Sequence, residues 1–220
     1  MAAPILMPTD TQILTLTQWL SPAFPVGSFA YSHGLEGAAG MGWVKDGAGL
    51  EAWLEDVLLH GAGRADSLLL AAAFHAGTSR RLGEIDRAAR AFAASAERRL
   101  ETEAQGLAFG RALAAWDVAP KELTFPVALG AAAAQESLPL ALTQKLYLHA
   151  FLSNLVAVGQ RLLAVGQQQG QAMLRRLTLL CTEVARDTRD GDLSKLASAA
   201  FLTDIASMRH ESQNSRIFRT

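Results

Sequence analysis

The chain has 220 residues, half of them apolar, and is long enough to bury on the order of 70% of its unfolded surface in a core of its own. Acidic and basic residues nearly cancel to a formal net charge of −1, which argues against a nucleic-acid partner and against a disordered acidic tail. The one cysteine, Cys181, excludes a disulfide within the chain and favours a reducing compartment.

Apolar residues recur with helical spacing along nearly the whole chain, and no run alternates as strands do. The first expected helix begins at the cap Asp10 and ends at the rigid loop Pro22–Gly27. A helix interrupted by glycines is expected over residues 28–41, and another from the cap Asp46 to Gly61 and Gly63. Further helices are expected over residues 64–76, 83–94, 95–116, 127–136, 140–165, 167–187 and, after the cap Asp192, 192–208. We predict an all-α fold: a single-domain helical bundle of roughly nine to ten helices over residues 1–208, with a tail at 209–220 that is flexible when alone.

The longest expected helix, 140–165, is apolar over most of its circumference. Four of its polar residues, Lys145, His149, Ser153 and Gln160, fall within about 80° of one another at 100° per residue. Such a helix is central to a fold and has one narrow polar stripe. The stripe either borders a wet channel or is an ordinary exposed face.

Two features favour a cytoplasmic protein without a membrane segment. The first residues lack the basic and long apolar regions of a signal peptide. The most apolar long window, 146–165, contains several polar side chains, too many for a span that faces lipid: His149, Ser153, Asn154, Gln160 and Arg161.

Local sequence contains no catalytic arrangement and no metal motif. No two of the five histidines have i, i+4 spacing, and the glycine-rich pieces lack the strand and lysine of a phosphate loop. Glu101 and Gln105 share a helix face and are expected to form a solvated or capping pair. The apolar residues either fill a core or also close a dimer or contact a partner, and the tail with Phe218 between Arg216 and Arg219 is the best local candidate for a partner contact.

Several motifs in chain order carry a resemblance to a known family. SPAFPVGSFAYSHGLE at Ser21–Glu36 resembles the N-terminal signature of the urease accessory protein F family, UreF, and HESQNSRIFRT at 210–220 resembles its C-terminal signature. Between them, the segments at residues 42–44, 101–110, 125–133 and 165–171 also resemble family motifs. The chain differs where many members have Glu-Asn-Gln, at Ser153-Asn154-Leu155, and has Ala164 in place of a usual proline.

The resemblance implies an all-α, dimeric protein that is not an enzyme and has no catalytic residue or tightly bound cofactor. Members of the family are scaffolds in a nickel metallochaperone complex. They bridge an accessory protein called UreH or UreD and the GTPase UreG during GTP-dependent nickel insertion into apo-urease. Nickel would contact this chain in transit at most, along a path past His149, Ser153 and Gln160.

The resemblance also implies which residues contact partners. Tyr31, His33 and Glu36 belong to the N-terminal signature and are expected at a dimer or partner surface. Arg161, near the end of the central helix, is expected to face the GTPase. The tail residues His210, Arg216, Phe218 and Arg219 are expected to bind the UreH-like protein.

Two other functions remain open. The chain could be a GTPase-activating protein that supplies an arginine in trans, with Arg161 or a surface residue such as Arg64 as the candidate. Alternatively it could be an independent helical-bundle enzyme or small-ligand binder, which requires a roomy buried pocket with convergent polar groups.

Overall fold

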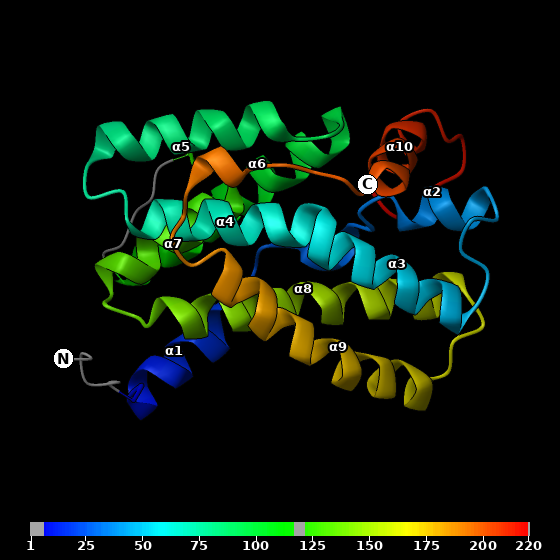
Figure 1. Ribbon diagram of the computed structural model, residues 1–220, viewed down its shortest axis with the longest axis horizontal. Helices are drawn as coiled ribbons and strands as arrows, with labels where there is room; N and C mark the ends of the chain where they lie inside the picture. The colour runs from blue at the N-terminus through cyan, green and yellow to red at the C-terminus, as the bar shows by residue number, and fades with distance from the viewer. Residues whose placement is uncertain (1–6, 117–121, 220) are drawn as a thin grey trace.

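The computed structural model describes residues 7–116 and 122–219, and within these ranges every regular element is a helix (Figure 1). The α-helices are α1 Asp10–Trp19, α2 Leu35–Gly40, α3 Gly47–His60, α4 Ala62–Phe74, α5 Ser79–Phe92, α6 Ala96–Ala112, α7 Phe125–Gln135, α8 Leu140–Leu162, α9 Gln167–Asp187 and α10 Phe201–His210. Three short 3-10 helices are η1 Ser28–Ala30, η2 Leu113–Trp116 and η3 Leu193–Lys195. The predicted all-α fold is confirmed.

The helices α3 and α4 cross the middle of the molecule, with α5 and α6 on one side and α8 and α9 on the other (Figure 1). The most extensive helix contacts join α4 to α7 and α8 to α9. One core includes residues from nearly all of these helices, and its aromatic centre places Trp19 edge-on to Phe109 at 5.6 Å between ring centroids. The short helices α2 and α10 lie together at one end of the molecule (Figure 1).

Polar caps explain where several helices begin. Thr9, and not Asp10 as expected, caps α1, because its hydroxyl accepts a hydrogen bond from the Gln12 N–H while the Gln12 side chain accepts one from the Thr9 N–H. The expected cap Asp46 is confirmed, since its Oδ1 accepts from the Gly49 N–H at 2.9 Å. Ser95 likewise caps α6 through the Arg98 N–H.

Two of the expected helices are broken, so those predictions were wrong. Residues 28–41 divide into η1 and α2, because His33 and Gly34 have φ values of 52° and 76°, which no right-handed helix contains. Residues 192–208 divide into η3 and α10. The chain between them leaves the helical path to pair the Ala199 N–H with the His60 carbonyl at 2.9 Å, beside the junction of α3 and α4.

The stretch Gly47–Phe74 is long and apolar enough to cross a membrane by length and composition alone. However, it is divided into α3 and α4 at Gly61, and 72% of its most apolar window is buried against the rest of the protein. Its burial is that of core helices.

Candidate functional site

The N-terminal signature and the C-terminal segment meet beside α2 and α10. These helices cross closely at two glycines of the sequence HGLEG: a Cβ atom at Gly34 would lie 2.7 Å from the Ser207 nitrogen, and one at Gly37 would lie 2.9 Å from the Ala206 carbonyl oxygen. Side chains at these positions would push α10 away. The glycines therefore let the last helix and the tail pack on the N-terminal segment.

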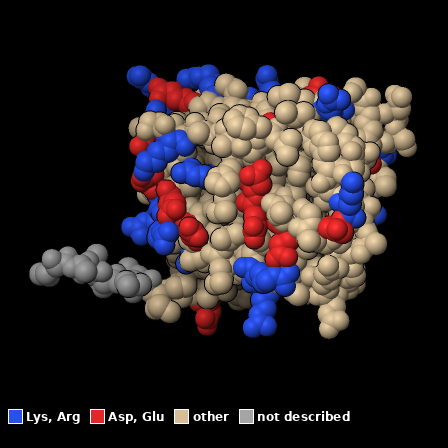
Figure 2. Space-filling view, turned by 45° about the vertical axis from the view of Figure 1, so that its right-hand side comes forward, with Lys and Arg blue, Asp and Glu red and all other residues tan. Residues whose placement is uncertain are grey.

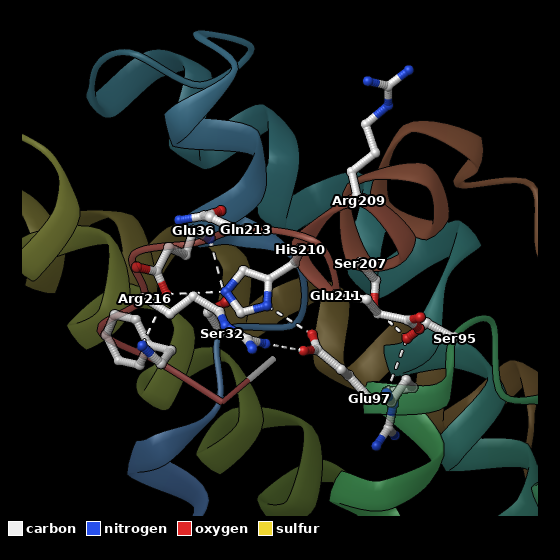
Figure 3. A network of polar contacts seen from close by, with 12 residues as sticks. Ser32, Glu36, Ser95, Glu97, Ser207, Arg209, His210, Glu211, Gln213 and Arg216 are labelled. Carbon is white, nitrogen blue, oxygen red and sulfur yellow. Dashed lines mark hydrogen bonds and ion pairs between the residues drawn. The ribbon is translucent and has the colours of Figure 1, made fainter.

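Glu36 of α2 holds the tail by its backbone (Figure 3). Its Oε1 accepts a hydrogen bond from the Ile217 N–H at 2.7 Å, and its Oε2 accepts from the Phe218 N–H at 2.8 Å and contacts His210 Nε2 at 3.1 Å. Burial by itself would raise the pKa of Glu36, but these donors outweigh burial and lower it. Glu36 is thus held as a carboxylate although only 5% of the residue is exposed.

His210, the last residue of α10, is fully buried between two carboxylates (Figure 3). Its Nδ1 lies 2.7 Å from Oε2 of Glu97, at the start of α6. Arg216 from the tail pairs with the other oxygen of Glu97. We call the set Glu36, Glu97, His210, Arg216 and Phe218 the terminal junction.

The rest of the tail extends the terminal junction to the N-terminal loop. The Arg219 N–H donates to the Ala30 carbonyl at 2.8 Å, and the Phe218 side chain is buried in the core. Ile217 and Arg219 face solvent, with Ile217 71% exposed. The structure thus places the tail against the body. That it is flexible in the isolated protein stays a prediction.

A second polar region lies under a groove of about 580 Å³ that α1, the loop after it, α6 and α8 line together. At its floor, Arg98 Nη2 pairs with Asp66 Oδ2 at 2.6 Å, and the Tyr147 hydroxyl donates to the same oxygen at 2.6 Å. His33 Nε2 lies 2.8 Å from Glu101 Oε1, which also accepts from Gln105 Nε2 at 3.0 Å. The expectation that Glu101 and Gln105 are solvated was wrong, since both are buried in this ionic network.

The network keeps its charges in a buried setting. Burial by itself would lower the pKa of Arg98, but Asp66 and Glu101 raise it above its usual value. Burial and the Asp66 carboxylate raise the pKa of Tyr147 well above its usual value, so the phenol stays neutral and donates its proton. His33 and Arg98 line both the groove and a second, smaller cavity of about 70 Å³.

The charged side chains at the surface form no large field of one sign on the face shown in Figure 2, where lysines and arginines alternate with acidic residues. Recognition through this face would therefore depend on the placement of individual side chains more than on overall charge.

Comparison with known proteins agrees with the family that the motifs indicate. A family model, UreF, matches residues 44–178. The protein named urease accessory protein UreF from Ruegeria pomeroyi is 50% identical over 214 residues, which cover 97% of this chain and 99% of the relative. This chain belongs to the UreF family of urease accessory proteins. Proteins of the same name from Roseobacter denitrificans and Rhodopseudomonas palustris are 49% identical over 217 residues and 40% identical over 232 residues; the matches cover 98% and 100% of this chain and 97% and 96% of those relatives.

In this UreF-family protein the expected partner residues fall in four places. Glu36, His210, Arg216 and Phe218 meet in the terminal junction, with Arg219 beside it. His33 belongs instead to the ionic network under the groove. Tyr31 is buried, and its carbonyl accepts a hydrogen bond from the Asn154 side chain at 3.3 Å. Arg161 is exposed at the end of the groove.

Only part of the polar stripe of α8 lines the groove. His149 and Ser153 line the groove, whereas Gln160 lies outside its lining and donates to the Gly166 carbonyl at 3.4 Å. Within the described ranges, no three histidine, cysteine, aspartate or glutamate side chains come together as metal ligands. The network residues Asp66, Arg98 and Tyr147 were missed from sequence, because they come from three different helices and no local motif connects them.

We expect Cys181 to be unreactive in the folded protein. The thiol is 1% exposed, and burial raises its pKa to about 12, so almost no thiolate forms at pH 8. A colorimetric thiol reagent should label it at least a hundredfold more slowly in buffer than in denaturing urea, on the scale of the suppressed thiolate and the blocked access. Rapid labelling of the native protein would contradict this expectation.

Proposed function

We propose that this chain is a non-catalytic scaffold for GTP-dependent nickel insertion into apo-urease, and that it bridges a UreH/UreD-like accessory protein and a UreG-like GTPase. The observation that supports this role is the terminal junction, in which both family signatures form one structural unit. By holding the tail backbone, Glu36 presents Ile217 and Arg219 at the surface. An ordered surface that includes an exposed apolar residue and an arginine is well suited to bind another protein.

The proposal includes a homodimer and a transient nickel path. Leu14 and Phe29, near and in the groove lining, are 67% and 63% exposed, and burial of such apolar residues would stabilise a second copy. His149 and Ser153 would supply polar walls for a hydrated ion along the same groove. Light scattering of the purified chain and of a Phe29→Asp variant would test the dimer.

The partner role is tested with a shortened chain. A chain that ends at Asn214 keeps α10 and His210 but lacks the segment that carries Arg216 and Phe218. A chain that ends at Ser207 is less suitable, because loss of His210 would leave Glu36 and Glu97 without the group between them. We expect the chain ending at Asn214 to bind the UreH-like protein at least tenfold more weakly in size-exclusion chromatography with light scattering, a loss of about 1.4 kcal/mol.

A surface variant and a folding check show whether weaker binding comes from loss of the tail contact or from misfolding. Leu179→Ser changes a residue that is 77% exposed on α9, and this variant should bind as the unmodified chain does. Circular dichroism melting checks that the shortened chain is folded. Equal binding by both chains would refute the tail as a docking element, and no binding by either would refute the bridging role.

A second candidate is stimulation of GTP hydrolysis by an arginine in trans. The exposure of Arg161 at the C-terminal end of α8 favours it, because an arginine finger must reach the nucleotide of another protein. Loss of a true arginine finger lowers GTP turnover by about 10³-fold or more. If Arg161→Ala leaves the turnover of the complete complex unchanged, Arg161 is excluded as that arginine.

A further inference from the structure

We propose that Asn154 of α8 is a positioning residue: its side-chain amide holds residues 28–31 of the N-terminal signature in the turn that exposes Phe29. The turn is η1, and the Phe29 side chain at its middle is 63% exposed in the lining of the groove. The conformational part of the inference concerns the chain by itself. That Phe29 then contacts a second copy of the chain rests on the proposed function.

The turn has weak hydrogen bonds of its own. The Ala30 N–H donates to the Gly27 carbonyl at 3.1 Å, and the Tyr31 N–H donates to the Ser28 carbonyl at 3.2 Å. A single 3-10 turn has poor hydrogen-bond geometry and bears the full entropic cost of nucleating a helix. Contacts with the rest of the protein must therefore select this shape of the chain.

Asn154 supplies such a contact at both ends of the turn. Its Nδ2 donates to the Ser28 carbonyl at 3.1 Å and to the Tyr31 carbonyl at 3.3 Å. An amide nitrogen carries two N–H donors, so one side chain satisfies both carbonyls. The reversed amide would place Oδ1 against two carbonyl oxygens, and the two acceptors therefore fix its orientation. The amide closes the turn from outside.

The same face of α8 also holds the residues that follow the turn. Phe151 lies three positions before Asn154, and its ring meets the His33 ring edge-on at 4.7 Å between centroids. His33 has a φ of 52° and pairs with Glu101 at 2.8 Å. These contacts hold His33, whereas the amide of Asn154 acts on the turn that carries Phe29.

Two other contacts keep the turn near the body and limit the effect of losing Asn154. The Tyr31 side chain is buried, and the Arg219 N–H donates to the Ala30 carbonyl at 2.8 Å. Neither contact supplies a donor to the carbonyls of Ser28 and Tyr31. Without the amide, these two groups would lose partners that the half-buried site provides, so residues 28–31 should loosen locally while the loop stays attached.

Hydrogen exchange of the full-length chain measures the turn directly. In Asn154→Leu, which has a similar volume but no donor, the amides of Ala30 and Tyr31 should exchange about tenfold faster, on the scale of two lost hydrogen bonds. Asn154→Asp places carboxylate oxygens against both carbonyls and should have at least the same effect. Gln171→Leu makes the matched change at an exposed amide of α9 and should leave exchange in the turn unchanged. Unchanged exchange in a folded Asn154→Leu variant would overturn the proposal.

A measurement on the unmodified chain keeps the proposal testable if the variants fail to fold. The sequence has two asparagines, Asn154 and the exposed Asn214, so labelling with ¹⁵N asparagine gives two side-chain amides to compare. Because both N–H groups of Asn154 are bonded to carbonyls, they should exchange with solvent at least about tenfold more slowly than those of Asn214. Equal exchange rates of the two side chains would contradict the proposal.

Association of the chain shows whether Asn154 acts through Phe29. In the proposed homodimer, Asn154→Leu should raise the dissociation constant by about threefold or more in sedimentation equilibrium, and this effect should vanish in a Phe29→Ala background. A general loss of stability would act equally in both backgrounds, and that result would overturn the link to Phe29. If the unmodified chain is monomeric, the proposed homodimer is refuted, whereas the exchange measurements still decide the role of Asn154.

Discussion

Replacement of Arg98 by methionine should lower the free energy of unfolding by about 3–5 kcal/mol, the usual cost of removing one partner from a buried ion pair. Arg98 pairs with Asp66 at 2.6 Å and lies 3.7 Å from Glu101, and these two carboxylates are 8% and 1% exposed at their side chains. Methionine fills a similar volume but supplies no charge. Both carboxylates would then remain buried without the cation that now offsets their desolvation.

Urea denaturation at pH 7 measures the effect, and two variants calibrate it. Arg176→Met breaks the pair with Glu51, whose arginine is 57% exposed, and should cost at most about 1 kcal/mol. Adding Asp66→Asn to Arg98→Met removes one of the stranded charges and should recover part of the loss. If Arg98→Met lowers the free energy of unfolding no more than Arg176→Met does, the buried network does not stabilise the contact between α4 and α6.

The same variant should show a characteristic pH dependence. Without Arg98, burial would disfavour the ionised forms of the Asp66 and Glu101 carboxyl groups in the folded chain. A group with a raised folded pKa contributes stability that is lost as the pH rises, so the deficit of Arg98→Met should shrink as the pH falls from 7 toward about 5. A deficit that stays constant over this range would indicate a packing defect in place of a stranded charge.

Gly130→Ala should be the other strongly destabilising change, by about 1–3 kcal/mol or more. A Cβ atom at Gly130 would overlap the carbonyl oxygen of Leu70 and come within 3.0 Å of Ala73 Cβ, at the crossing of α7 and α4. Because this crossing is the most extensive helix contact of the fold, the backbones cannot separate locally. The overlap outweighs the roughly 1 kcal/mol by which alanine favours a helix over glycine.

Gly83→Ala provides the matched comparison. Gly83 lies in α5, and the nearest atom to its Cβ position is Arg87 Nη1 at 3.9 Å. With space available, alanine should stabilise the protein by about 0.5–1 kcal/mol through its helix propensity. Urea denaturation should give changes in the free energy of unfolding of opposite sign for the two variants, because the contact with α4 and not the loss of glycine decides the outcome. Changes of the same sign would refute that explanation.

Helical periodicity was a sound guide wherever a segment is long and has its own end signals. The helix α9 has the bounds expected from sequence, 167–187, and Asp46 caps α3 as expected. The prediction failed over 28–41 and 192–208, where tertiary contacts bend the chain. There the left-handed residues His33 and Gly34 and the contact of Ala199 with His60 override local propensity.

The sequence by itself determined the helical class, most helix positions and, through motifs at both ends, the family. Only the tertiary structure decided that Glu36 and His210, 174 positions apart, share one junction, and that Glu101 belongs to a buried network instead of a solvated face. The physical reason is the distance along the sequence over which each effect acts. Helix formation depends on neighbours within a few residues, whereas the charge state and partners of a buried carboxylate depend on whichever distant segments the packing brings against it.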